Sequence, residues 1–323
     1  MFIKIIQILC LLIFTNEVLA DRPDAHAPIT IMGDHTHKNN EWMLSYRLMT
    51  MNMSDLYDGD SKISHNKVTG YMMVPTEMNM KMHMFGAMYG LNNRHSLMLM
   101  LPYIENNMKM LNAMTNNISK MSSEGFADVK ISDLINLSTN NWQNSLELGV
   151  SLATATIKAS YNGLRLPYRM QLGSGTYDVT MAFTGVKYLK QNSIGYQLKS
   201  LARLGRNSQG YSLGNKLSLT GWYAHKLTNN LSSSLNISYQ DEAKIDGKDN
   251  MIEAALMTSP SRKSSLSGGQ ILTGALGFNY LLNTGNKDAT RLAVEYKFPL
   301  YQKLAGPQLG LTNIITLGVQ QSF

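Results

Sequence analysis

The sequence predicts an all-β fold, a transmembrane antiparallel β-barrel of about 12 strands in an outer membrane. Three observations predict it. Apolar and polar residues alternate with a period of two over many segments, short and long connections follow one another in turn, and the N-terminus has the composition of an export signal. Together they indicate a chain that is exported and inserts into a membrane as strands.

Residues 1–20 form the expected signal peptide. Lys4 precedes an apolar stretch at 5–14, and small Ala20 stands before charged Asp21, where we expect cleavage. The apolar stretch is about half the roughly 20 residues of a spanning helix, so an N-terminal anchor is the weaker interpretation. Cys10 is the one cysteine, so we expect no disulfide and no cysteine-based site in the mature chain.

The mature chain divides into a tail at 21–40 and a barrel at 41–323. The formal net charge is +7, which in an exported chain favours contact with anionic lipid head groups or small anions. Outer-membrane lipid and a small solute or metal ion are therefore the expected partners, and no nucleic acid is expected.

From residue 41 onward the chain alternates. In "TRLAVEYKF", Leu292, Val294 and Tyr296 share one face, while Arg291 and Glu295 share the other. A membrane barrel turns the apolar face to lipid and the polar face to the lumen. About twelve such strands are expected, near 41–53, 77–90, 95–104, 125–138, 142–154, 176–190, 193–205, 214–227, 231–241, 271–282, 288–299 and 312–323.

The connections favour a barrel over a soluble sandwich. Short polar turns are expected at 91–94, 139–141, 191–193, 228–230 and 283–287. Between them come long links at 54–76, 105–124, 155–175, 206–214, 241–270 and 300–311. This alternation is typical of outer-membrane barrels, and an even strand number places both termini in the periplasm. The terminal Phe323 resembles the recognition signal of such barrels, which implies the barrel-assembly machinery as a partner.

Five stretches resemble one family, the outer-membrane transporters grouped as phenol-degradation meta-pathway proteins. They are "APITIMGDHTHKNNEWMLSYRLMTMNM", "VPTEMNMKMHMFGAMYG", "LRLPYRMQLGSGTYDV", "KIDG" and "GPQLGLTNIITLGVQQSF", and they extend from residue 27 to the C-terminus. The resemblance implies a porin-like outer-membrane barrel with a transport role. Members similar in the methionine- and histidine-rich part are associated with heavy-metal handling, so the resemblance also implies a link to copper.

Methionine is concentrated in one part of the chain, since 18 of the 23 methionines fall between residues 32 and 121. Alternation places Met49 and Met51 of the first strand and Met98 and Met100 of the third strand on the inner face. Thioethers are soft ligands that suit Cu(I), so these four are candidate metal ligands. The competing interpretation is that methionine acts as a flexible apolar filler.

The strand between them, "MNMKMHMFGAMYG" at 78–90, is ambiguous. If Met78, Met80, Met82 and Met84 face inward, Lys81 faces lipid, which is costly near the midplane. If the strand is turned over, the methionines lie in the bilayer. The sequence leaves both orientations open.

The tail offers a second set of candidate metal ligands. Asp34, His35 and His37 lie close together, with His26 nearby, and imidazole and carboxylate groups are common ligands. We expect thioether sites to take Cu(I) or Ag(I) and the histidines to take Cu(II), so a Cu ion is the candidate cofactor. The same tail is also a candidate plug that folds into the lumen.

Charged residues on the expected inner face are mainly basic. They are Arg47, Lys130, Lys199, Arg203, Lys216, Arg291 and Lys297, against Asp128, Glu147 and Glu295. Such a wall favours anions or uncharged solutes over free cations. The alternative is an interior filled by interlocked ion pairs with no open channel.

No enzyme is expected. His225 has no accompanying serine motif, and "GSGTYD" does not open a helix as a phosphate cradle requires. The predicted function is passage or binding of small solutes, with a link to copper or other soft metals. The alternatives are an uptake channel for small hydrophobic, aromatic or anionic compounds, or a structural barrel without an open pore.

Overall fold

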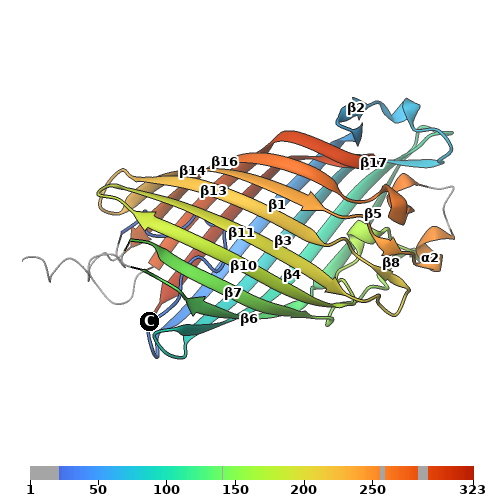
Figure 1. Cartoon of the computed structure of the whole chain (residues 1–323). Coiled ribbons are helices and arrows are strands. Elements are labelled where there is room, and N and C mark those ends of the chain that lie inside the picture. The colour runs from blue at the N-terminus through green and yellow to red at the C-terminus, as the bar shows by residue number, and fades with distance from the viewer. Residues whose placement is uncertain (1–21, 140, 255–258, 283–289) are drawn as a thin grey trace, which may run out of the picture.

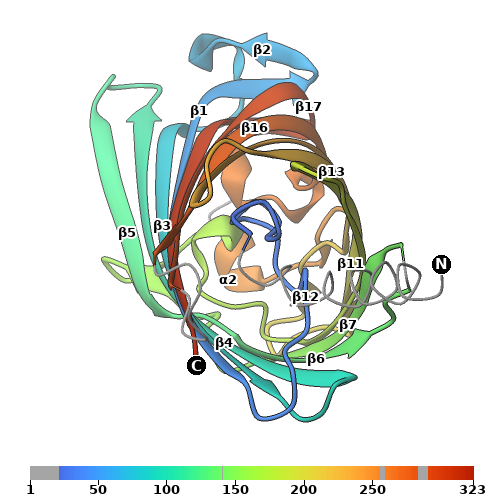
Figure 2. The same cartoon turned by 90° about the vertical axis from the view of Figure 1, so that its left-hand side faces the viewer.

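The computed structural model describes residues 22–139, 141–254, 259–282 and 290–323, and the expected signal at 1–20 lies outside them. Eleven labelled strands pair antiparallel with their neighbours, and β17 pairs with β1, which closes a barrel (Figures 1 and 2). They are β1 (Trp42–Gly59), β3 (Met73–Gly90), β4 (His95–Asn112), β6 (Val129–Asn136), β7 (Gln143–Leu152), β10 (Tyr177–Tyr188), β11 (Asn192–Leu204), β13 (Lys216–Lys226), β14 (Leu231–Glu242), β16 (Gly269–Leu282) and β17 (Thr290–Ser322). The predicted all-β barrel is confirmed.

The strand β17 contains both of the last two expected strands. It is 33 residues long; its first part, up to Leu304, pairs with β16, and the part that follows pairs with β1. Arg291 donates to Gln320 at 2.6 Å, so the two ends of β17 lie side by side. The chain reverses near Gly306, whose φ of 104° is unfavourable for residues with a side chain. The ring therefore has eleven labelled strands, whereas about twelve were expected, because β17 covers two of the expected ones.

Two strands lie outside the ring. β2 (Ser61–Ile63) pairs with β1, and β5 (Ile118–Phe126) pairs with the second half of β4. The sequence predicts residues 118–124 as part of a long link and joins 125 and 126 to the strand that follows, because the polar residues of β5 show no apolar face. In Figure 2, β5 stands away from the ring of strands.

The two ends of the barrel differ. One end, called here the turn rim, carries the connections at 91–94, 137–139 with 141–142, 189–191 and 227–230; the expected turn at 283–287 lies outside the described residues. The start of β1 and the end of β17 lie at the same rim, where Phe323 N donates to Trp42 O at 2.9 Å. The other end, the loop rim, carries the long links. These contain β8 (Ser160–Tyr161), β9 (Leu164–Arg165), β12 (Tyr211–Ser212), β15 (Asp246–Gly247), α2 (Asn250–Glu253) and the short 3-10 turns η1 (His65–Lys67), η2 (Tyr168–Met170), η4 (Pro260–Arg262) and η5 (Ser264–Leu266).

The outer face of the barrel is apolar over a broad belt. Its exposed side chains include Leu44, Phe85, Leu97, Leu99, Ile131, Leu148, Val150, Met181, Leu198, Leu219, Leu235, Ile237, Leu276, Phe278, Leu292, Val294, Ile315 and Leu317. Exposure of this much apolar surface is costly in water but favourable against lipid. The alternation seen in the sequence therefore places apolar side chains outside and polar side chains inside. Within the described residues, no helix is long and apolar enough to cross a membrane.

Candidate functional site

Three neighbouring strands, β1, β3 and β4, line the inside of the barrel with methionine. Their register places Met53 opposite Met78 and Met78 opposite Met108, and all three side chains are buried. Met80, Met82 and Met84 follow on the same face of β3 and pack against buried clusters. The orientation that the sequence left open is therefore inward.

The outward position of Lys81 is tolerated because β3 extends beyond the apolar belt. An outer row of rings, Tyr46, His83, Tyr103 and Phe126, crosses four strands, and the Tyr46 hydroxyl lies 2.8 Å from His83 Nδ1. Lys81 lies on the loop-rim side of this row and is paired in register with Glu105. Aromatic rows of this kind mark the membrane boundary, so Lys81 avoids the midplane.

Residues 22–37 lie inside the barrel at the turn rim, where Figure 2 shows the dark blue tail within the ring of strands, and residues 38–40 are exposed at that rim. Side chains of five strands, β7, β10, β11, β14 and β17, donate to tail carbonyls. Ser193 donates to Asp24 O at 2.6 Å, Ser232 to Pro23 O at 2.7 Å, Tyr188 to Ala25 O at 2.8 Å, Arg291 to Ala27 O at 2.6 Å, Gln197 to Met32 O at 2.9 Å and Ser145 to Gly33 O at 3.0 Å. These bonds hold the tail in one path across the lumen.

Gly33 is required where the tail turns. Its φ is +71°, and an added Cβ would lie 3.1 Å from Leu134 and 3.2 Å from the Glu147 carboxylate. A residue without a side chain therefore fits here on both conformational and steric grounds. The turn places Asp34 and His35 directly after Met32 against the methionine-lined wall.

The tail brings three of the predicted ligands together. Ligand atoms of His26, Asp34 and His35 lie within 4.8 Å of one another. The ring of His35 is 5.2 Å from that of His26 and 5.0 Å from that of His37, so three imidazoles stand side by side. Asp34 lies 2.9 Å from His35 Nδ1 and accepts from Ala27 N at 3.0 Å. A bend of the tail, which sequence spacing did not show, moves His26 next to residues eight and nine positions later.

The surroundings of these four groups shift their pKa values in different directions. Burial lowers the pKa of His26, and the Arg291 guanidinium lowers it further. Burial also lowers the pKa of His37. Burial opposes the ionisation of Asp34, but the charge and hydrogen bond of His35 outweigh this effect and hold its pKa well below the usual range. Burial likewise disfavours charged His35, yet Asp34 prevails and raises its pKa. At His26 and His37, burial thus favours the neutral imidazole, which has a nitrogen lone pair for a ligand.

A small cavity joins the tail to the methionine-lined wall. It is lined by Asp34 and His35 of the tail, by Ser45 and Arg47 of β1, by Gly86 of β3 and by five thioethers, Met32, Met43, Met88, Met98 and Met100. Met98 and Met100 were candidate ligands and lie here. Met49 and Met51 lie farther along β1 toward the loop rim, opposite Met82 and Met80, and do not line this cavity.

The predicted inner charges are mostly paired. Lys199 lies 3.3 Å from Glu147, and Lys130 contacts the same carboxylate. Arg203 pairs with Asp178.

Glu295 accepts from Thr30 of the tail at 2.7 Å and lies 3.8 Å from Lys297. Arg291 binds Asn279, Gln320 and the tail, whereas Arg47 Nε has no partner among the described residues. Paired charges reduce the positive field that the sequence predicted for the wall.

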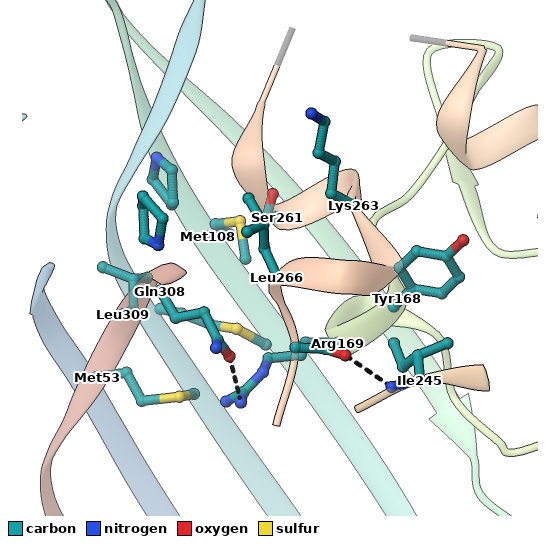
Figure 3. Close-up of a pocket in the computed structure, with 14 residues that line it drawn as sticks. Met53, Met108, Tyr168, Arg169, Ile245, Ser261, Lys263, Leu266, Gln308 and Leu309 are labelled. Carbon is teal, nitrogen blue, oxygen red and sulfur yellow. Dashed lines mark hydrogen bonds between the residues drawn. The ribbon is translucent and has the colours of Figure 1, made fainter. Parts of the chain in front are cut away.

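A second pocket lies inside the loop rim (Figure 3). It has a cavity volume of about 40 Å³ and apolar walls formed by Met53, Met78, Met108, Ile245, Leu266, Leu309 and two prolines. Arg169 and Lys263 also line it. Arg169 donates to Gln308 at 3.0 Å, and neither cation forms a salt bridge within the described residues. The pocket therefore offers a small apolar space lined by two cationic side chains, of which Lys263 also places its Nζ 5.7 Å from the centroid of the Tyr71 ring.

Sequence reasoning missed this pocket. Arg169 lies in η2, Lys263 between η4 and η5, and Gln308 in β17, so residues of three distant links meet only when the barrel closes. The stretch "LRLPYRMQLG" places two arginines among apolar residues inside a long link, which indicates a buried cationic site. The sequence does not show that Arg169 points into the same pocket as Lys263.

A comparison with protein-family models finds no match, and a comparison with curated proteins finds no similar sequence. The fold is similar to that of an outer membrane channel from Pseudomonas putida F1, with a TM-score of 0.62, 10% identity, and coverage of 91% of this chain and 99% of that one. KdgM porin (TM-score 0.41, 10% identity, 87% and 99% covered) and NanC porin (0.43, 10%, 85% and 98%) are more distant. The chain therefore has the fold of a bacterial outer-membrane barrel.

Proposed function

We propose that this barrel passes small solutes across an outer membrane and that the loop-rim pocket selects small amphipathic anions. One observation carries the proposal: apolar walls and two cations without carboxylate partners among the described residues meet in one pocket inside the barrel. Apolar walls favour a short hydrocarbon body, and Arg169 and Lys263 favour a carboxylate or another anion. This proposal corresponds to one of the alternatives that the sequence left open, an uptake channel for small hydrophobic, aromatic or anionic compounds.

The tail at 21–40 acts in this proposal as a plug of the turn rim, facing the periplasm. Its support is the set of hydrogen bonds from the wall to residues 23–33. Counting the two parts of β17 separately gives twelve barrel strands, and an even number is supported by the start of β1 and the end of β17 lying at the same rim. A role without catalysis is proposed.

Equilibrium binding to the purified full chain in detergent tests the pocket, with hexanoate as the probe and hexanol as its uncharged counterpart. We expect hexanoate to bind and hexanol to bind more weakly. Replacing both cations, Arg169→Met with Lys263→Met, removes two partly exposed charges worth about 0.5 to 1 kcal/mol each. Hexanoate affinity should therefore fall by about 5- to 30-fold, with hexanol unchanged.

The matched control is Lys62→Met with Arg206→Met, which removes one lysine and one arginine at the loop rim outside the pocket. Equal losses in both double variants would show a general field effect and contradict a selective pocket. Passage itself is measured as hexanoate entry into liposomes by the chain with and without residues 22–40. If neither form passes hexanoate or any small ion, a structural barrel without a pore is the better account.

A further inference from the structure

We propose that the cavity between the tail and the methionine-lined wall binds one soft monovalent metal ion, Cu(I), through the thioethers of the wall together with the His26, Asp34 and His35 cluster. This site goes beyond solute passage, because it lies at the turn rim, whereas the pocket that selects the solute lies at the loop rim.

The first observation is the convergence of nitrogen and oxygen donors. Three ligand atoms of His26, Asp34 and His35 fall within 4.8 Å of one another, close enough to contact one ion. The ring of His37 stands 5.0 Å from that of His35, and its Nε2 atom is buried without a hydrogen-bond partner among the described residues. A buried imidazole nitrogen without a hydrogen bond is costly, and a metal ion within reach of His37 would satisfy it.

The second observation is independent of the tail. Met43, Met88 and Met98 form one row across β1, β3 and β4, because they are paired in register. The neighbouring row is Ser45, Gly86 and Met100, and an added Cβ on Gly86 would lie 2.5 Å from Ser45 Oγ. The Ser45 hydroxyl therefore lies directly over Gly86, and the thioethers line the cavity around these two small residues. Asp34 and His35, two of the three residues of the cluster, line the same cavity as the thioethers.

Charge and ligand chemistry select the ion. Thioethers are neutral, soft ligands that suit Cu(I), while hard divalent ions prefer oxygen. Arg47 lines the cavity, and Arg291 lies close to Asp34 and His26, so positive charge is already present. A monovalent ion balanced by the Asp34 carboxylate adds less repulsion than a divalent ion does.

The competing explanation is that these methionines only fill space. Methionine packs irregular interiors, and Met49, Met51, Met80 and Met82 do so on the same inner face without any nearby histidine cluster. This second set has the same number of residues and the same chemistry as the wall part of the cavity. It therefore serves as a matched control.

The test is a competition titration of the purified full chain with Cu(I) against a colorimetric Cu(I) chelator. We expect one tight site per chain. The cavity variant, with Met43, Met88, Met98 and Met100 all replaced by leucine, should lose at least about tenfold in affinity. The control variant, with Met49, Met51, Met80 and Met82 replaced by leucine, should bind like the unmodified chain. Leucine keeps apolar volume, and heat-modifiable migration on gels checks that each barrel is folded.

Two further measurements cover the case in which the cavity variant does not fold. Asp34→Asn should lower Cu(I) affinity by about 10- to 100-fold, whereas His65→Gln, a histidine in a loop-rim turn, should not. X-ray absorption of the Cu(I)-loaded unmodified chain should show sulfur neighbours at the metal. Equal losses in both quadruple variants, unchanged binding in the cavity variant, or only nitrogen and oxygen neighbours would each overturn the proposal.

Discussion

Removing two wall hydroxyls should loosen the plug without touching the rest of the barrel. Ser193 and Ser232 are both fully buried and donate to Asp24 O at 2.6 Å and to Pro23 O at 2.7 Å. A neutral hydrogen bond contributes about 0.5 to 1.5 kcal/mol net, so Ser193→Ala with Ser232→Ala should weaken the closed state by about 1 to 3 kcal/mol. The population with a displaced tail should then rise by about 5- to 140-fold.

Single-channel recording in planar bilayers measures this population as the open fraction, and a chain lacking residues 22–40 supplies the fully open reference. Ser234→Ala is the matched control. Ser234 lies two residues from Ser232 on the same inner face and is buried, but its hydroxyl has no partner among the described residues. If the double variant opens no more often than Ser234→Ala, the hydrogen bonds do not hold the plug. If removal of 22–40 leaves the current unchanged, the tail does not block the lumen.

Other predictions concern the tail turn and the wall beneath it. Gly33→Ala should cost about 1 to 2 kcal/mol of tail docking, because alanine disfavours the positive φ of this position. The open fraction in planar bilayers should then rise by about 5- to 30-fold, and an unchanged open fraction would contradict the steric argument. Glu147→Gln should lower the free energy of unfolding in urea by about 3 to 5 kcal/mol, because Lys130 and Lys199 then lose the carboxylate that they share. A loss below about 1 kcal/mol would show that water already solvates both lysines.

The alternation and link lengths determined the barrel because a β-strand has a side-chain period of two and a closed sheet needs turns at both rims. Strand ends such as 143–152 and 231–242 were predicted to within two residues. The inner position of Met98 and Met100 also followed locally, since leucines occupy every other position of that strand.

The tertiary structure decided what local pattern left ambiguous. Met78, Met80, Met82 and Met84 face inward because β3 pairs in this register with β1 and β4. The length of β3 places Lys81 beyond the aromatic row, and the sequence of one strand does not reveal this position. His26 joins Asp34 and His35 because the tail bends inside the barrel, where wall side chains bind its carbonyls. Arg169 and Lys263 share a pocket only because two distant links fold into the same lumen. Period and spacing describe neighbours along the chain, whereas a site is formed by residues that closure of the barrel brings together.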